Sequence, residues 1–250
     1  MSDRQGVIAG NVYDKYGSRT PLVRRLMAGF FSAFSELIQP LAVERCLEVG
    51  CGEGRLMRHL KELRKEMVVW GSDISEEILR VAADMHYDCS LIGASVESLP
   101  FETGAFDLVV ACEVLEHVMR PHEAMAEIKR VTNSYVLVSV PWEPIWRLLN
   151  LLRGGYITRW GNTPGHINHW SRQGFIRLLE PHLTILKIKT PLPWMMALCQ
   201  KGVIGTSIVR NEHSRASRAR REVSQCDALY VPEIKSLISP PRFLRKSPFR

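Results

Sequence analysis

The sequence lacks several patterns that would fix its class at once. No apolar run reaches the roughly 18 residues that a membrane-spanning helix needs, and the opening residues, MSDRQGVIAG, contain no apolar core like that of a secretory signal peptide. The six cysteines form no CxxC pair and no zinc-ligand spacing, so we expect reduced thiols. These absences favour a cytoplasmic globular protein without a membrane span, and they leave its oligomeric state open.

Excess basic charge is missing from most of the chain. The formal net charge is +7, and residues 201–250 alone hold 11 Lys and Arg against 4 Asp and Glu. The first 200 residues therefore hold 22 basic and 22 acidic residues, which predicts no basic groove in the folded body. Residues 211–250 are rich in Arg, Ser and Pro, which predicts a basic, disordered tail. Such a tail could meet RNA or an anionic membrane, but a solvated tail is the favoured interpretation.

Short apolar segments alternate with helical patterns through the middle of the chain. This alternation is typical of an α/β, doubly wound, mostly parallel sheet. Strands are predicted over 43–49, 67–73, 89–95, 105–112, 134–141 and 183–189, and helices over 55–66, 75–86, 121–131 and 171–180. Before them, apolar residues recur at three- and four-residue steps at Leu22, Leu26, Phe30, Phe34 and Leu37, which predicts an N-terminal helical cap within residues 1–42.

The segment CLEVGCGEGRL, residues 46–56, places three glycines at alternate positions between a predicted strand and a predicted helix. Gly50, Gly52 and Gly54 permit positive φ angles and a close approach of a ligand to the backbone. Such a turn lies at the carboxyl end of a parallel sheet, where α/β proteins bind ligands. The spacing differs from the GxGxxG of pyrophosphate-binding turns, and no Gly-Lys-Ser/Thr follows. Dinucleotide and nucleoside-triphosphate binding are therefore disfavoured.

Four further features lie at or near the ends of successive predicted strands. Glu48 precedes the first glycine by two residues, Asp73 ends the second strand, SVESLPF (95–101) follows the third, and FDLVVACEVLEHV (106–118) ends the fourth and is expected to begin a helix. Together with the glycine turn, they strongly resemble the class I S-adenosylmethionine-dependent methyltransferases, in particular the type 11-like small-molecule group. The resemblance implies a seven-stranded Rossmann-like domain over 43–210, with 141–170 as an acceptor-side insertion or lid.

The resemblance also implies S-adenosyl-L-methionine as the cofactor. Glu48 and the glycine turn would hold its methionine moiety, Asp73 its ribose, and Ile74 one face of its adenine. Where many relatives carry Asp, this chain has Ser95, whose neutral hydrogen bond to adenine is the weaker one. The implied cofactor-binding residues are Glu48, Gly50, Cys51, Gly52, Gly54, Asp73, Ile74, Ser95, Val96 and Cys112.

Catalytic candidates come from two segments. EVLEHV would place Glu113, Glu116 and His117 on one helical face. Some ubiquinone-pathway O-methyltransferases resemble this stretch and hold a divalent metal there, whereas many methyltransferases carry the same LEH without one. No metal is the favoured interpretation, and His117 is a candidate base. TPGHINHWS (163–171) adds His166 and His169, although His169 could simply pack at the start of the next helix.

The segment WEPIWRLLNLLRGG (142–155) carries Ile145, Leu148, Leu149 and Leu152 on one helical face. It is interpreted as a lid over an apolar acceptor, with an ordinary packed insertion or a dimer contact as alternatives. Tyr13 and Tyr16 lie where N-terminal helices close over the cofactor in the resembled family. The predicted activity is methyl transfer to an oxygen of a small apolar or phenolic acceptor. The alternatives are an RNA or protein methyltransferase that uses the basic tail, or a non-catalytic cofactor-binding subunit.

Overall fold

The structure is a computed structural model that describes residues 20–85, 88–152, 154 and 156–202. The predicted tail (211–250), Tyr13 and Tyr16 lie outside the described residues. Within the described part of the chain, no helix is both long enough and apolar enough to cross a membrane.

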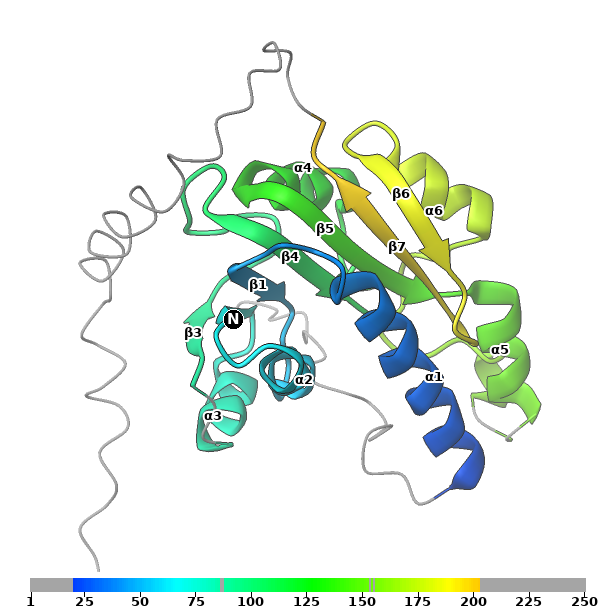
Figure 1. The fold of residues 1–250 in the computed structure, drawn as a ribbon. Helices are drawn as coiled ribbons and strands as arrows, with labels where there is room; N and C mark the ends of the chain where they lie inside the picture. Colours follow the sequence, from blue (N-terminus) through cyan, green and yellow to red (C-terminus); the bar gives the residue numbers. More distant parts are fainter. Residues whose placement is uncertain (1–19, 86–87, 153, 155, 203–250) are drawn as a thin grey trace, which may run out of the picture. The chain divides into compact units, whose positions relative to one another are not determined.

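A single seven-stranded sheet organises the described residues, in the order β3-β2-β1-β4-β5-β7-β6 (Figure 1). Neighbours from β3 to β5 run parallel, whereas β7 is antiparallel to both β5 and β6. The predicted mostly parallel, doubly wound sheet is therefore confirmed. The strands are β1 (Arg45–Val49), β2 (Val68–Asp73), β3 (Ser90–Gly93), β4 (Phe106–Cys112), β5 (Thr132–Pro141), β6 (Thr184–Lys189) and β7 (Trp194–Gln200).

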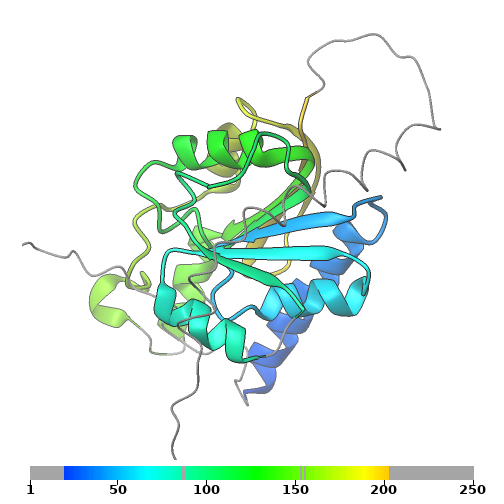
Figure 2. The ribbon, with the colours of Figure 1, turned by 90° about the vertical axis from the view of Figure 1, so that its left-hand side faces the viewer.

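Helices cover both faces of this sheet, and each face has its own hydrophobic core. On one face α4 and α6 pack through residues such as Met125 and Phe175. On the other, α1 and α2 pack through residues such as Phe34 and Met57, so the sheet lies between two helical layers (Figure 2). The helices are α1 (Pro21–Ile38), α2 (Arg55–Leu63), α3 (Glu76–Asp84), α4 (Pro121–Val131), α5 (Glu143–Leu152), the 3₁₀ turn η1 (Ile157–Arg159) and α6 (Arg172–Leu179).

Local sequence signals account for most helix starts. The hydroxyl of Ser75 accepts a hydrogen bond from the backbone N–H of Ile78, and Ser171 caps α6 through Gly174 in the same way. Proline stands at the start of both α1 and α4, where its missing N–H costs nothing. The predicted apolar stripe of α1 is confirmed from Phe30 onward, but the side chain of Leu22 is exposed near the helix start.

Candidate functional site

A cavity of about 970 Å³ opens at the carboxyl ends of the parallel strands. Its walls come from the ends of β1, β2 and β4, the segment after β3, the start of α1, helix α5 and the segment around His166. The structure brings most of the predicted cofactor-binding residues together here. Those that line the cavity are Glu48, Gly50, Cys51, Gly52, Asp73, Ile74, Ser95, Val96 and Cys112.

Three glycines shape the turn between β1 and α2. Gly50, Gly52 and Gly54 have φ angles of 65°, 53° and 76°, all in the left-handed region that favours glycine. A Cβ atom at Gly50 would also lie 2.5 Å from Cγ2 of Val114, so this position excludes any side chain. Gly54 lies at the N-cap of α2 and is not among the residues that line the cavity. Its role in the structure is to start the helix.

The amides of this turn are already engaged by the protein. The N–H of Cys51 donates to the Ser72 carbonyl, that of Gly52 to Oδ2 of Asp73, and that of Gly54 to the Cys51 carbonyl, each at 2.9 Å. A phosphate-binding turn needs free amides that converge on an anion. The amides of Cys51, Gly52 and Gly54 are therefore not free to bind an anion.

Glu48 contributes a buried carboxylate to the cavity wall. Its residue exposure is 3%, and its Oε2 atom has no hydrogen-bond partner among the described residues. Burial raises the pKa of Glu48 well above its ordinary value, against the opposing effect of the Met57 backbone N–H, and the nearby Asp73 raises it further. A buried carboxylate is costly unless a cation or hydrogen-bond donors meet it. An ammonium group of a ligand would satisfy that requirement.

Acidic groups dominate the polar lining as a whole. Among the described lining residues, the only basic Lys or Arg is Arg55, which pairs with Glu53 at 3.3 Å. The acidic lining residues are Glu48, Glu53, Asp73, Glu97, Glu113 and Glu116. Such a cavity suits a cationic or neutral ligand and disfavours a polyphosphate.

The end of the cavity beyond β2 suits a flat, uncharged ring. Ile74 is 58% exposed and offers an open apolar side chain, while Val96 lies buried beside it in the lining. The Ser95 hydroxyl accepts a hydrogen bond from the N–H of Glu97 at 3.2 Å, and its own O–H remains a donor. These features are compatible with the predicted adenine contacts.

The helix predicted to begin in 113–118 is absent, and this expectation was wrong. Glu113 has a φ of 60°, and its carboxylate accepts hydrogen bonds from the Trp194 indole at 2.7 Å and the Ser139 hydroxyl at 3.4 Å. Residues 115–117 form a turn, and the helix starts only at Pro121. Glu113, Glu116 and His117 therefore do not share a helical face.

Asn168 explains why this segment forms a turn. Its side-chain amide donates to the carbonyls of Leu115 at 2.9 Å and Val118 at 2.7 Å. The backbone N–H groups of Ile167 and Asn168 both donate to the carbonyl of Glu116. In a helix, these carbonyls would accept hydrogen bonds from the helix's own N–H groups. Here they accept from residues 167 and 168, so the two segments pack together.

Two of the three candidate catalytic histidines reach the cavity, namely His117 and His166. His169 does not line it; its Nδ1 lies 3.2 Å from Oε1 of Glu143 instead. Nδ1 of His117 lies 3.0 Å from the carbonyl of Gly165. Since a carbonyl only accepts, this contact assigns the proton of a neutral His117 to Nδ1.

Helix α5 forms part of the cavity wall. Trp146, Leu149 and Asn150 line the cavity, whereas Leu148 and Leu152 are exposed. The Trp146 indole donates to the Thr163 hydroxyl at 2.9 Å and stacks on His166, with ring centroids 5.9 Å apart. The helix is therefore fixed to the segment that carries His166.

Two lining residues were not predicted from the sequence: Trp194, which begins the unpredicted strand β7, and Asn150, which lies within the largely apolar helix α5. Asn150 is 4% exposed and donates to the carbonyl of Gly161 at 2.8 Å. A polar residue inside an apolar stripe was the available signal.

Comparisons with known proteins agree with this geometry. Residues 47–137 match the family model described as "Methyltransferase domain". A ubiquinone/menaquinone biosynthesis C-methyltransferase of Burkholderia vietnamiensis is 32% identical over 117 residues, which is 43% of this chain and 48% of that protein. A malonyl-[acyl-carrier protein] O-methyltransferase of Legionella pneumophila is 29% identical over 126 residues, which is 48% of this chain and 44% of that protein. The matched region thus spans less than half the length of these curated relatives.

Solved structures show the same fold. The magnesium protoporphyrin IX methyltransferase of Synechocystis PCC 6803, solved with bound S-adenosylhomocysteine, superposes with a TM-score of 0.56. That superposition covers 74% of this chain and 90% of the other chain at 16% sequence identity. At this identity, the likeness shows a shared fold and not a shared activity.

Proposed function

We propose that this chain, whose residues 47–137 match the model of a methyltransferase domain, is a class I methyltransferase that transfers a methyl group from S-adenosylmethionine to an oxygen of a small-molecule acceptor. One observation carries the proposal. A glycine turn with internally bonded amides lies beside the buried Glu48 carboxylate, in a cavity of about 970 Å³. This combination suits a nucleoside joined to a cationic amino acid.

The chain's own residues supply each contact that the cofactor needs. Glu48 pairs with the ammonium, the carboxylate of Asp73 accepts from the ribose hydroxyls, and Ile74 and Val96 pack on the adenine. Asp73 already accepts the N–H of Gly52 and of Ser75, each at 2.9 Å, which fixes its carboxylate at the end of β2. When bound, the cofactor supplies an electrophilic methyl group on a sulfonium.

The other end of the cavity is suited to the acceptor. Leu26, Met27, Trp146 and Leu149 give the cavity apolar walls, and His117 also lines it as the candidate base. An apolar molecule with a hydroxyl group fits both features, because the base removes the hydroxyl proton as the new bond to carbon forms. Holding that oxygen in line with the methyl group lowers the barrier by about 7–11 kcal/mol when alignment is ideal.

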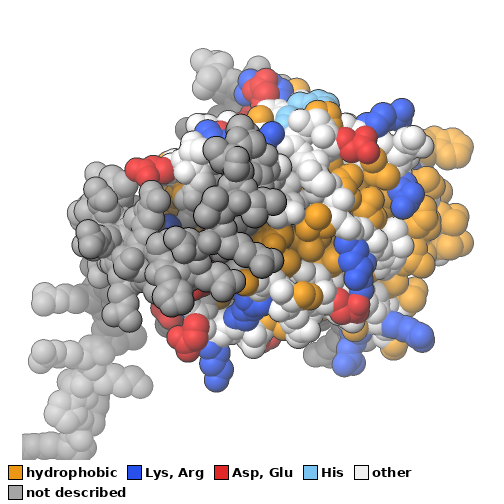
Figure 3. Space-filling view, turned by 45° about the horizontal axis from the view of Figure 1, so that its top comes forward, with side chains coloured by type: hydrophobic (Ala, Val, Ile, Leu, Met, Phe, Trp, Pro, Cys, Tyr) orange, Lys and Arg blue, Asp and Glu red, His pale blue; other side chains and the backbone are white. Residues whose placement is uncertain are grey.

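The charge distribution favours a small acceptor over RNA. The cavity lining is acidic, and among the described side chains seen in Figure 3 the Lys, Arg, Asp and Glu residues are interspersed with apolar ones. A nucleic-acid site requires clustered positive charge. The alternative, methylation of RNA or protein, depends on the Lys and Arg residues of the predicted tail.

Methyl-labelled S-adenosylmethionine tests the proposal directly. The purified full chain is incubated with it and with an extract of the host organism, and the label is then followed into organic-soluble, RNA and protein fractions. We expect label in the organic-soluble fraction, bound through an oxygen. Label confined to RNA or protein would replace the proposal with the alternative, and no transfer at all would favour a non-catalytic cofactor-binding subunit.

A further inference from the structure

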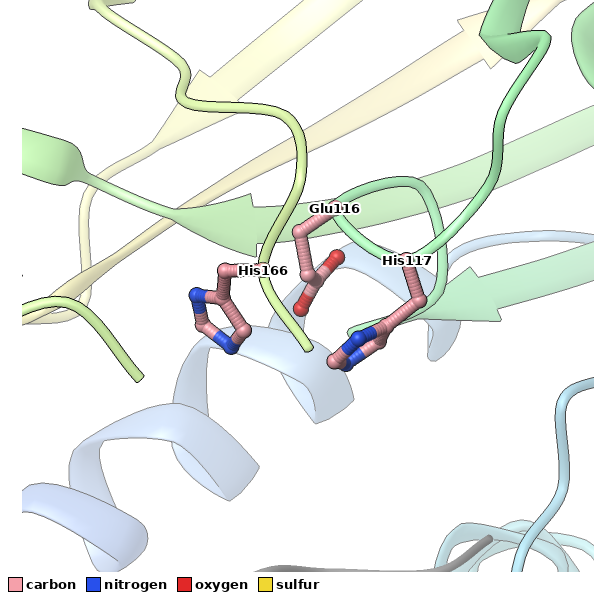
Figure 4. Close-up of side chains that lie close together, drawn as sticks. All are labelled: Glu116, His117 and His166. Carbon is pink, nitrogen blue, oxygen red and sulfur yellow. The ribbon is translucent and has the colours of Figure 1, made fainter. Parts of the chain in front are cut away.

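We propose that Glu116, His117 and His166 form a binding site for one divalent transition-metal ion. One ligand atom from each of the three lies within 4.8 Å of the other two, and all three residues line the cavity. Figure 4 shows the three side chains converging, two from the turn after β4 and one from the segment before α6. Glu113, whose carboxylate meets Trp194 and Ser139, is not part of this set.

The surroundings of the two histidines support coordination. Histidines that bind a metal usually direct their second ring nitrogen to a carbonyl or carboxylate, which fixes the ring and its tautomer. Nδ1 of His117 follows this pattern, 3.0 Å from the carbonyl of Gly165, whereas the buried Nδ1 of His166 lies 3.8 Å from Oε1 of Glu143 and has no hydrogen-bond partner among the described residues. The ring of His117 is thus fixed, and His166 keeps a buried nitrogen that an ion could satisfy.

Glu143 is buried behind His166 and is held in place by two further contacts. Its carboxylate lies 2.8 Å from Nε of Arg147 and 3.2 Å from Nδ1 of His169. His169, predicted as a catalytic residue, is therefore better placed to position Glu143 behind His166.

The backbone holds the two halves of the site in place without a metal. Asn168 joins the segment of His166 to the turn of His117 through the carbonyls of Leu115 and Val118. Closing the three ligand atoms to the distances of about 2.0–2.2 Å from one zinc ion needs side-chain movements of about 1 Å. The site is therefore nearly preorganised.

The ligand set indicates the class of ion. Two imidazoles and one carboxylate suit zinc, cobalt or ferrous ions, whereas magnesium and calcium prefer oxygen ligands. Three protein ligands leave coordination positions open. His117 is exposed, so the site can be reached from the cavity mouth.

Given the proposed methyl transfer, an ion here would change how the acceptor is activated. His117 would bind the ion and could no longer act as the base. The ion would instead lower the pKa of a coordinated acceptor hydroxyl, and the proton would pass to solvent water at the exposed side of the site, which favours an acceptor with a hydroxyl or enol oxygen as its reacting atom.

Cobalt titration of the full, untagged chain tests the site, with visible absorption as the signal. We expect one tight cobalt ion per chain, displaced by an equivalent of zinc. His166→Ala and Glu116→Gln should each weaken that binding by about 10–100-fold or more. His182→Ala is the matched control for adventitious binding, because Nδ1 of His122 and Nε2 of His182 lie 3.3 Å apart on the exposed surface. This variant should keep the affinity of the unaltered chain. Glu113→Gln should also leave the affinity unchanged.

Each outcome decides the proposal. Absence of tight cobalt binding in the unaltered chain would overturn the proposal. So would a result in which His182→Ala loses cobalt binding while His166→Ala retains it. Equal losses in Glu113→Gln would move the site to a different ligand set and so also refute it. Binding of S-adenosylhomocysteine by every variant reports correct folding. Should the unaltered chain bind cobalt but no S-adenosylhomocysteine, the proposed function would fail while the metal site stood.

Discussion

Asp73 and Asp107 each accept hydrogen bonds from two backbone N–H groups, but only one of them lies at the cavity. Asp73 ends β2 and accepts the N–H groups of Gly52 and Ser75, while Oδ2 of Asp107, near the start of β4, accepts those of Glu44 and Arg45. Both fix loops, but they lie at opposite ends of the parallel strands. Only Asp73 lines the cavity.

We therefore expect Asp73→Ala to weaken S-adenosylhomocysteine binding by about 1.5–3 kcal/mol, or roughly 10- to 150-fold, because a charged acceptor for the ribose is lost. Isothermal titration calorimetry measures the change. Asp107→Ala, the matched control, should lower stability while leaving that dissociation constant unchanged. Equal affinity losses in both variants would show a general folding defect and refute the ribose assignment.

Glu48 gives a prediction about pH. Burial raises its pKa in the folded state, so between its ordinary and its raised pKa the folded chain binds more protons than the unfolded one. The free energy of unfolding contributed by this group therefore falls as pH rises through that window. Urea denaturation of the ligand-free chain at several pH values should show the decline, and Glu48→Gln should flatten it. A decline of the same size in the Gln variant would contradict this account.

His117 gives a prediction about turnover. In the metal-free protein, His117→Ala should lower the rate by about 10²–10⁴-fold, the usual contribution of a general base, while S-adenosylhomocysteine still binds. His169→Ala should have a much smaller effect, because His169 does not line the cavity. Single-turnover rates with labelled cofactor measure both. Full activity of the His117 variant would remove it from the mechanism.

At the scale of elements, the contact between the turn at 115–118 and the segment at 166–168 builds the acceptor end of the site. Asn168→Ala removes the donor to two carbonyls, which should cost about 1–3 kcal/mol of stability. Turnover should fall as His117 and His166 separate, with cofactor binding retained. Thermal unfolding and rate measurements test this together.

Asn133→Ala provides the comparison, since that amide makes a 3.5 Å contact to Asp107 away from the cavity. It should change turnover little. If Asn168→Ala behaved like Asn133→Ala in both stability and rate, the two segments would not depend on this contact.

The same contact marks a limit of sequence analysis. The spacing of Glu113, Glu116 and His117 fits a helical face, and nothing within EVLEHV indicates otherwise. The turn forms because Asn168 and its neighbours, distant in sequence, bind the carbonyls of residues 115, 116 and 118. By contrast, the glycine turn, Ser75 and Ser171 act locally, and their positions were predicted correctly.

At the scale of the whole molecule, the alternation of strands and helices predicted the sheet class, while the strand β7 was not located. Its sequence, WMMALCQ, is almost entirely buried and shows no two-residue alternation, so a periodic pattern could not reveal it. The sequence also does not reveal its partners, because β7 follows β6 in the chain but inserts antiparallel between β5 and β6. That position brings Trp194 to Glu113 and into the cavity wall.

The central claim is that this cavity binds an amino-acid nucleoside and not a phosphorylated one. Calorimetric titration of the full chain with S-adenosylhomocysteine, NAD⁺ and ATP, under identical conditions, tests it most directly. We expect one S-adenosylhomocysteine to bind per chain and neither NAD⁺ nor ATP to bind, because three amides of the glycine turn are engaged within the protein and the buried Glu48 favours a cation. Binding of NAD⁺ or ATP without S-adenosylhomocysteine would contradict it.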